Sequence, residues 1–350
     1  MSKKSDLVRH VEDRIEKHLP KKWTKKEIGN FTGSAVFDLD TKALNENLSI
    51  PLSDFVKRGG KRLRPQLYIS CLETFGVNYK EYLDLAVVIE LIHNATLILD
   101  DIEDEGMLRR GKPTLHIKYG LDTAVNSGFL LHILPMRLVL DREKDLSYGK
   151  KLKIWNLYYE SLVNVGLGQA MDIYWHKHIN GDISIRHYLE MARLKTGSLM
   201  RMSVGMACIV AGLHKKSMEK FEKFAESLGL AFQIIDDSLD IKNCDQRFGK
   251  TYGNDITEGK VSLPVVYAFE KIDSKDKIRL VNILAKHTRD KRDIQKALKI
   301  IKESGAVERS LKKANEIIDD AWAKIEKDFS KRYDLKRLKK IAYVFVNRDF

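Results

Sequence analysis

The chain has 350 residues, of which 43% are hydrophobic and 32% are charged, and its formal net charge is +13. This length and composition allow a large buried core and exclude a disordered or fibrous class. The positive charge favours anionic partners, namely nucleic acid, an anionic membrane surface or phosphorylated small molecules. Because the 62 basic residues are dispersed among 49 acidic ones and are not interleaved with stacking aromatics, we expect no nucleic acid partner.

Composition also indicates a fold class and a compartment. Only 6 prolines and 21 glycines interrupt the chain, which favours long helices. Cys71, Cys208 and Cys244 lie far apart in the sequence, so we expect neither a disulfide framework nor a zinc site. We find no signal-peptide pattern and no uninterrupted apolar stretch of about 18 residues. The prediction is a cytoplasmic, all-α protein with no membrane span.

Taken in chain order, the sequence begins with a charged lead-in. Residues 1–45 are polar and only weakly periodic, and we interpret them as a helix and a loop ahead of a main domain at 46–350. From Ser53 onward apolar residues recur at helical spacing, and we expect no strand pair or hairpin. The stretch 85–99 is apolar nearly all round, which predicts a buried central helix.

Two acidic clusters directly follow apolar helical stretches. The first acidic cluster is Asp100, Asp101 and Asp104, and the second is Asp236, Asp237 and Asp240. Residues four apart share one face of a helix, so each cluster forms an oxygen-rich surface. A lone cluster of this kind is usually solvated surface. Two copies, both following apolar helices, predict a site for Mg²⁺ and a diphosphate, because Mg²⁺ prefers a few carboxylates, waters and phosphate oxygens.

Basic residues near both clusters supply the positive charge that a diphosphate needs. They lie in segments 59–65, 109–111, 195–197 and 255–260, and arginine matches phosphate oxygens bidentately. His93, seven residues before Asp100, is a further candidate donor. A lone histidine in an apolar helix is, however, more often a satisfied core residue. No serine-hydrolase, P-loop or dinucleotide-binding motif is present.

These motifs resemble those of the trans-isoprenyl diphosphate synthases, especially the geranylgeranyl diphosphate synthases, from about Leu52 to the C-terminus. The most specific match is segment 91–113, which contains the first acidic cluster and the Arg109-Arg110-Gly111 tail. Further matches follow in the family's order at 60–65, 169–175, 195–197, 232–240 and 253–260. The resemblance implies an isoprenoid-synthase-type bundle of about ten or more helices around a central cavity. It also implies a homodimer.

The resemblance further implies a reaction and roles for individual residues. The enzyme would condense isopentenyl diphosphate with an allylic diphosphate, use about three Mg²⁺ ions, and make the C20 product geranylgeranyl diphosphate. Magnesium on the allylic diphosphate would be held by Asp100, Asp104 and Asp236. The oxygens of this diphosphate would be neutralised by Arg109, Lys195 and Lys260. The acidic walls of the site would be completed by Asp101, Asp237 and Asp240. The isopentenyl diphosphate would be bound by Lys61, Arg64, His93 and Arg110, while Thr196 and Gln233 would face the developing allylic cation.

Product length would be set by residues near the first acidic cluster. Ala95 and Thr96 precede Asp100 by five and four residues, where short-chain members of the family carry bulky aromatics, so small side chains leave a tunnel open. Phe129, His132 and Ile133 are the candidates for the tunnel floor. This pattern disfavours a C15 stop and favours C20, with a longer polyprenyl product as the alternative.

Two other function classes remain as alternatives. A class I terpene cyclase shares helices and an acidic motif, and a non-catalytic subunit of a heteromeric synthase is expected to have lost part of one motif. Both clusters are intact here, and segments 60–65 and 109–111 argue against a cyclase. The basic, amphipathic segment 335–348 predicts a packed closing helix, with peripheral membrane contact as the alternative.

Overall fold

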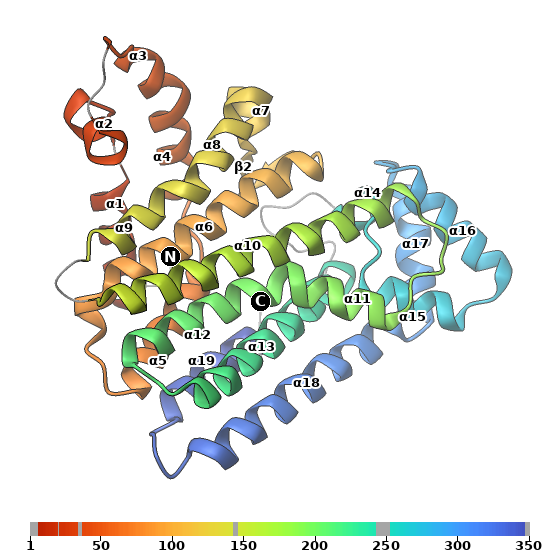
Figure 1. The fold of residues 1–350 in the computed structure, drawn as a ribbon. Coiled ribbons are helices and arrows are strands. Elements are labelled where there is room, and N and C mark those ends of the chain that lie inside the picture. The colour runs from red at the N-terminus through yellow and green to blue at the C-terminus, as the bar shows by residue number, and fades with distance from the viewer. Residues whose placement is uncertain (1–5, 20, 34–36, 143–145, 243–252, 347–350) are drawn as a thin grey trace. The chain divides into compact units, whose positions relative to one another are not determined.

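The computed structural model describes residues 6–19, 21–33, 37–142, 146–242 and 253–346 (Figure 1). Cys244 lies outside these residues. The chain divides into two compact units, Met1–Trp155 and Asn156–Phe350, with the boundary inside one helix, α10 (Tyr148–Lys177). Within the described residues both units are helical apart from one short hairpin, so the all-α prediction, with more than ten helices, is confirmed. The proposed boundary between a lead-in and a catalytic domain near residue 45 stays a prediction.

Unit 1 is built around one long apolar helix. Its elements are α1 (Asp6–His18), α2 (Lys25–Thr32), α3 (Thr41–Leu44), the π-helix η1 (Asn45–Ser49), α4 (Ile50–Lys57), α5 (Leu63–Thr74), the 3₁₀ turn η2 (Tyr79–Tyr82), α6 (Leu83–Glu103), β1 (Leu108–Arg109), β2 (Lys112–Pro113), α7 (Leu115–Tyr119), α8 (Leu121–Ile133), the 3₁₀ turn η3 (Leu134–Met136), α9 (Arg137–Leu140) and the start of α10 (Tyr148–Lys177). Helices α1, α5 and α8 pack against α6. The predicted central helix is therefore present, and it ends at the first acidic cluster.

The lead-in contributes a helix to the core of unit 1. Val8, Val11 and Ile15 of α1 are buried, and α1 packs on α6. His18 of α1 contacts Asp84 at the start of α6, with 2.9 Å between Nε2 and Oδ1. Apolar burial and this polar contact tie the N-terminal helix to the helix that carries the first acidic cluster.

The expectation that the chain has no hairpin was wrong. Strands β1 and β2 pair antiparallel, Leu108 with Pro113 and Arg109 with Lys112. The two connecting residues, Arg110 and Gly111, have φ values of 56° and 74°. A two-residue loop with positive φ at both positions matches the right-handed twist of the flanking strands. Strands of two residues carry no hydrophobic alternation, so periodicity could not predict them.

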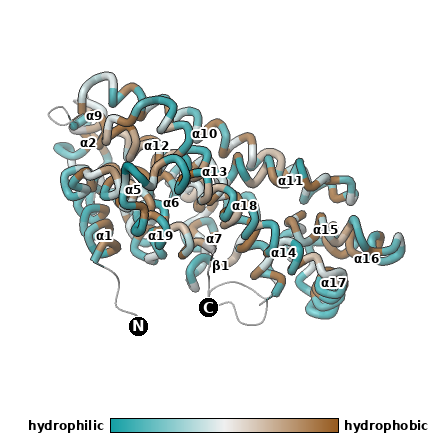
Figure 2. The backbone as a smooth tube through the Cα atoms, turned by 90° about the horizontal axis from the view of Figure 1, so that it is seen from below, coloured by the Kyte–Doolittle hydropathy of each residue, from teal (hydrophilic) through white to brown (hydrophobic). Residues whose placement is uncertain are grey.

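Unit 2 contains the remainder of α10 and the elements after it. These are α11 (Ile185–Ala192), the π-helix η4 (Arg193–Gly197), α12 (Ser198–Ala211), α13 (Lys215–Lys242), α14 (Asn254–Thr257), α15 (Leu263–Lys271), α16 (Ser274–Ala285), α17 (Lys291–Glu303), α18 (Ala306–Phe329) and α19 (Lys336–Val346). Helix α13 is the centre of this unit, because α12, α18 and α19 all pack against it. Figure 2 shows that α17 is mostly hydrophilic. Only one side of this helix is buried, so the residues on its other side are polar.

The predicted closing helix is α19. It packs against α13 and α18 and buries Leu338, Ile341, Ala342 and Phe345. The ring of Phe345 lies edge-on to that of Phe232 of α13, with 5.6 Å between centroids. The apolar face of α19 is thus used inside unit 2.

Two described stretches are long and apolar enough to cross a membrane by length and composition alone. They are Tyr79–Glu103 and Leu121–Leu140, with mean hydropathies of 1.6 and 1.3 over their most apolar windows. The first is 67% buried and contains Glu90, which is ion-paired inside the protein. We interpret it as a core helix, since a buried helix passes the same test. The second is 44% buried, and its exposed apolar side chains are Leu121, Val125, Phe129 and Ile133 of α8 and Leu140 of α9.

Candidate active site

The first acidic cluster lies at the C-terminal end of α6. Helix α6 ends at Glu103, and Asp104 continues its last turn by donating its N–H to the carbonyl of Asp100 at 2.9 Å. The one-turn spacing of Asp100 and Asp104 expected from sequence is therefore present. Asp101 is buried, with 2% of its surface exposed.

The β1–β2 hairpin returns Arg109 to this cluster. Its Nε donates to Oδ1 of Asp101 at 2.7 Å, and its NH2 lies 3.5 Å from Oδ2 of Asp100. Burial raises the pKa of Asp101 to about 6, even though the Arg109 charge and hydrogen bond act to lower it. A single guanidinium therefore compensates only part of the cost of burying this carboxylate.

Basic side chains from the start of α5 lie beside His93, which stands on α6 about two turns before the first acidic cluster. Arg64 NH1 donates to Nε2 of His93 at 3.1 Å, which places the imidazole proton on Nδ1. Burial and the neighbouring Arg64 and Arg110 lower the pKa of His93 well below its usual value. His93 is thus neutral, and its Nδ1 is buried without a hydrogen-bond partner among the described residues. Lys61, three residues before Arg64, is exposed.

Unit 2 has a pocket lined by the second acidic cluster. Its lining includes Asp236, Asp237 and Asp240 from α13 together with the predicted residues Lys195, Gln233 and Lys260, and it adds Asp172, Tyr188 and Asp255. Its volume of about 60 Å³ suits ions or waters rather than a prenyl chain, since liquid water takes about 30 Å³ per molecule. Six residues expected at the site are therefore gathered in one small polar pocket.

Asp237 is held by neutral donors. It accepts hydrogen bonds from the Tyr188 hydroxyl at 2.6 Å and from Nε2 of Gln233 at 2.7 Å. The Thr196 hydroxyl in turn donates to Oε1 of Gln233 at 2.6 Å. Burial, followed by the charge of Asp255, raises the pKa of Asp237. The predicted residues Thr196 and Gln233 are thus joined to the second acidic cluster by a chain of hydrogen bonds.

Both predicted lysines of unit 2 contact carboxylates. Lys195 Nζ lies 2.6 Å from Oδ2 of Asp172, and Lys260 Nζ lies 2.6 Å from Oε2 of Glu258. Burial alone would raise the pKa of Asp172, but Lys195 and Lys260 lower it. Asp172 is therefore an ionised counter-charge that holds the Lys195 ammonium at the pocket.

Close helix packing positions Lys195 and Thr196 beside the second acidic cluster. Both belong to the π-helix η4, and single-turn π-helices are frequent at functional sites. A Cβ added to Gly168 of α10 would lie 2.5 Å from the backbone nitrogen of Lys195, and one added to Gly229 would lie 2.7 Å from Cα of Gly197. Glycine at these two positions is what allows η4 to approach α10 and α13 so closely.

The carboxylates suit a hard divalent cation. Oδ2 of Asp101 is buried and has no hydrogen-bond partner among the described residues. Burial is the largest cause of the raised pKa values of Asp101 and Asp237, which means that both carboxylates are costly to keep charged without a cation. Among the described residues, no three His, Cys, Asp or Glu side chains converge into a complete metal site. Mg²⁺ binds through one or two carboxylates together with waters and substrate phosphates, so open oxygen-rich faces fit it.

The structure places the chain-length candidates in different environments. Ala95 is buried, and Thr96 donates its hydroxyl to the carbonyl of His93 at 2.8 Å. His132 is half-buried, with Nδ1 donating to the carbonyl of Gly128 at 2.9 Å. Phe129 and Ile133 are 61% and 47% exposed. The role of these two residues in the tunnel floor stays a prediction.

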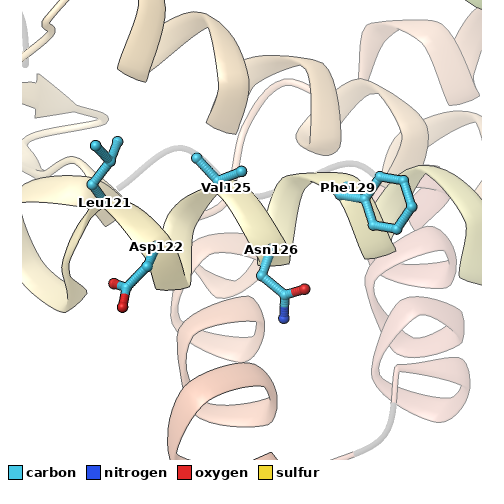
Figure 3. Close-up of a pocket in the computed structure, with 5 residues that line it drawn as sticks. All are labelled: Leu121, Asp122, Val125, Asn126 and Phe129. Atoms are coloured by element: carbon cyan, nitrogen blue, oxygen red, sulfur yellow. The ribbon is translucent and has the colours of Figure 1, made fainter.

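The exposed residues form an apolar stripe along α8. Leu121, Val125, Phe129 and Ile133 recur every four residues, and the first three line an open groove with Asp122 and Asn126. Figure 3 shows Leu121 and Val125 on one side of the helix and Asp122 and Asn126 on the other. The opposite side of α8 is buried against α6 through small residues, among them Gly128, whose added Cβ would lie 2.8 Å from Leu99.

Sequence reasoning missed several residues of both sites. In unit 2 these are Asp172, Tyr188 and Asp255; Asp172 and Asp255 stand inside recognised motifs without an assigned role. In unit 1 they are Arg62, Glu90 and Asn94, which form a buried polar network behind Arg110. The available signal was Glu90 itself, since a charge inside an apolar helix is costly unless it is paired.

Comparison with known proteins places the chain in a family. The polyprenyl synthetase family model matches residues 45–301. The short chain isoprenyl diphosphate synthase of Methanocaldococcus jannaschii is 36% identical over 241 residues, which cover 69% of this chain and 72% of that protein. The geranylgeranyl diphosphate synthase of Sulfolobus acidocaldarius is 32% identical over 236 residues, covering 67% of this chain and 71% of that protein.

Solved structures agree with the sequence comparison. The crystal structure of geranylgeranyl pyrophosphate synthetase from Pyrococcus horikoshii matches with a TM-score of 0.81 and 27% sequence identity, covering 97% of this chain and 96% of that one. The isoprenoid-synthase fold implied by the sequence motifs is thereby confirmed. The chain belongs to the polyprenyl synthetase family and is a trans-prenyltransferase of the isoprenyl diphosphate synthase type.

Proposed function

We propose that the enzyme condenses isopentenyl diphosphate with an allylic diphosphate and releases geranylgeranyl diphosphate as its main product. The observation that carries this proposal is the pair of acidic clusters, each accompanied by basic side chains within its own unit. Carboxylates for a divalent cation and cations for diphosphate oxygens are the combination that a diphosphate leaving group requires. The relatives named for C20 synthesis favour this product length.

In this proposal the two clusters serve the allylic diphosphate. Asp100, Asp104 and Asp236 would hold about three Mg²⁺ ions, and Asp101, Asp237 and Asp240 would complete the acidic walls. Bound magnesium would supply positive charge to the leaving diphosphate. Arg109, Lys195 and Lys260 would neutralise its outer oxygens; the Lys195–Asp172 contact at 2.6 Å supports this role because it keeps the ammonium charged and oriented.

The second substrate would be bound by the basic residues of unit 1. The residues that would hold the isopentenyl diphosphate are Lys61, Arg64, His93 and Arg110. The allylic C–O bond breaks, the isopentenyl double bond forms the new C–C bond, and the released diphosphate takes the proton that is lost. Thr196 and Gln233 would face the developing cation with their oxygen atoms.

Product length is the finer part of the proposal. We propose that small residues at Ala95 and Thr96 admit a chain longer than C15, with His132 limiting it. A C25 product is the second candidate, because the geranylfarnesyl diphosphate synthase of Aeropyrum pernix is 32% identical over 253 residues. Cytoplasmic location is part of the same proposal, and peripheral membrane contact receives no support from α19, whose apolar face is buried.

We also propose that the enzyme is a homodimer. The apolar stripe of α8 supports this, since contiguous exposed apolar side chains mark interaction surfaces. Light scattering after size-exclusion chromatography should give about twice the 40.3 kDa chain mass. Val125→Asp should shift the protein toward the monomer; an unchanged dimer would exclude this stripe as the interface.

Chromatography of the dephosphorylated products tests the reaction and its product. The enzyme is incubated with Mg²⁺, isopentenyl diphosphate and either dimethylallyl, geranyl or farnesyl diphosphate. A dominant C20 alcohol from all three primers is expected. A C25 or longer alcohol would move the length limit, whereas cyclised hydrocarbons or no turnover would contradict prenyl elongation.

A further inference from the structure

One buried carboxylate lies behind the basic side chains of unit 1. Glu90 of α6 is 2% exposed, so no ligand reaches it. Its Oε1 accepts hydrogen bonds from Arg62 NH1 at 2.5 Å and from Asn94 Nδ2 at 2.9 Å. A buried charge persists only where partners compensate it. Of these two partners, Arg62 belongs to the segment that carries Lys61 and Arg64, and Asn94 contacts Arg110.

The first partner anchors the segment that carries Lys61 and Arg64. The side chain of Arg62 is itself 2% exposed, and its NH2 donates to the carbonyl of Val56 at 2.9 Å. Its Nε also lies 3.9 Å from Oε1 of Glu12 in α1. Arg62 has a left-handed backbone with φ of 49°, a conformation that non-glycine residues hold only when surrounding contacts enforce it. Arg62 is thus an internal anchor and not a substrate ligand.

The second partner leads to Arg110. Asn94 is fully buried, and its Oδ1 accepts from Arg110 NH1 at 3.4 Å. The Arg110 guanidinium also lies 5.9 Å from the Phe55 ring centroid and against Gly60, where an added Cβ would lie 3.1 Å from NH2. The position of Arg110 is therefore set by Asn94, by an aromatic face and by the glycine beside Lys61.

The network brings like charges together around one opposite charge. Arg62, Arg64 and Arg110 all contact one stretch of α6, at Glu90 (2.5 Å), His93 (3.1 Å) and Asn94 (3.4 Å) respectively. Unscreened guanidinium groups repel one another, so such a group needs a counter-charge to stay in place before an anion binds. Glu90 supplies that charge from the buried side, which leaves the other side of the basic group to a ligand.

We propose that Glu90 is a positioning residue, which through Arg62 and Asn94 fixes Lys61, Arg64 and Arg110 in the geometry that binds isopentenyl diphosphate. The inference rests on the proposed role of those three residues. Preorganisation of binding groups lowers the cost of binding, so loss of Glu90 affects the affinity for that one substrate.

Steady-state kinetics of Glu90→Gln test the inference. This variant keeps the size and the hydrogen-bonding oxygen but removes the charge. The KM for isopentenyl diphosphate is expected to rise about tenfold, while kcat and the KM for farnesyl diphosphate stay within about threefold. An unchanged KM for isopentenyl diphosphate in folded Glu90→Gln protein would overturn the inference.

A double variant separates positioning from stability. Glu90→Gln strands the Arg62 charge and is expected to lower Tm, whereas Glu90→Gln with Arg62→Met removes both buried charges and should recover Tm. The KM is expected to stay raised in the double variant, because Lys61 and Arg64 have lost their anchor. Recovery of the wild-type KM together with Tm would show that Glu90 acts on stability alone and would overturn the inference.

Two further variants complete the experiment. Asp84→Asn is the matched control on the same helix: Asp84 pairs with His18 at 2.9 Å and with Arg142 at 3.3 Å, so its loss should lower Tm and leave the KM unchanged. Lys61→Ala and Arg110→Ala test the underlying assignment. If neither raises the KM for isopentenyl diphosphate, the binding assignment fails and the inference with it; if both do and Glu90→Gln does not, the positioning role alone fails.

Discussion

The two acidic clusters share a spacing but not an environment. On α6, Asp101 is paired with a guanidinium, that of Arg109, and burial still raises its pKa to about 6. On α13, Asp237 accepts hydrogen bonds from the neutral Tyr188 and Gln233, and both burial and the nearby Asp255 raise its pKa. The same motif therefore holds its buried aspartate in two ways, through a guanidinium on α6 and through neutral hydrogen-bond donors on α13. A bound divalent cation would add positive charge to both clusters.

The largest expected effect is that of removing the first carboxylate of each acidic cluster. Asp100→Asn and Asp236→Asn should each lower kcat by at least about 100-fold, because each would lose a charge that acts on the leaving diphosphate. Product formation at saturating substrate and Mg²⁺ measures this. Activity within about threefold of wild type in either variant would show that its cluster is not required.

Removing one hydrogen-bonding partner of each buried aspartate measures how much the charged and the neutral partner contribute. Arg109→Gln removes a charge and should lower kcat/KM for farnesyl diphosphate by about 30-fold, whereas Tyr188→Phe removes one hydrogen bond to a carboxylate and should cost about tenfold. Kinetics with farnesyl diphosphate varied at saturating isopentenyl diphosphate give both values. A larger loss for Tyr188→Phe than for Arg109→Gln would reverse the electrostatic ranking of the two clusters.

Close packing in unit 2 offers a third test, with a control in the same helix. Gly168→Ala would bring a Cβ to 2.5 Å from the Lys195 backbone, whereas Gly166 has no neighbouring atom within 4 Å of an added Cβ. We expect Gly168→Ala to lower kcat by about tenfold through displacement of η4. Gly166→Ala should stay within about twofold. Equal activities would mean that η4 adapts without moving Lys195 or Thr196.

Asp54 differs from the buried aspartates of both clusters, because two basic side chains pair with it directly. Burial would raise its pKa, but Arg58 and Lys118, with nitrogens at 2.9 and 3.0 Å, lower it to about 2. A depressed pKa stabilises the folded state above the unfolded pKa of about 4 and loses that effect as pH falls toward 2. Asp54→Asn should reduce the free energy of unfolding by about 1 kcal/mol at neutral pH.

Urea unfolding measures this smallest effect. The difference between wild type and Asp54→Asn should shrink as the pH falls from about 6 to about 3. A difference that does not change with pH would mean that the ion pairs of Asp54 do not stabilise unit 1.

Contiguous features could be predicted from sequence, and spatial ones could not. Helix α6 and its acidic end were predictable because apolar periodicity and the motif lie in one stretch. The roles of Arg62 and Glu90 depend on a contact across 28 positions, which no local pattern reports. The β1–β2 hairpin depends on a positive φ at Arg110, a conformation that arginine does not favour.

The outer face of α8 shows a different limit. Both sides of this helix carry apolar residues, so periodicity does not distinguish the side that packs on α6 from the side that is exposed. The role of Phe129 and Ile133 in a tunnel floor stays a prediction, while small residues such as Gly128 make the close contact with α6. Tight helix packing requires small side chains, and a search for large apolar residues at helical spacing does not detect them.

The most direct test of the central claim is the stoichiometry of diphosphate release. Wild-type enzyme is mixed with Mg²⁺ and farnesyl diphosphate, with and without isopentenyl diphosphate, and released diphosphate and new C–C bonds are counted in the same samples. We expect one diphosphate per C–C bond, release that depends on isopentenyl diphosphate, and loss of both signals in Asp100→Asn and Asp236→Asn. Equal release without isopentenyl diphosphate, or release that persists in either variant, would contradict the central claim.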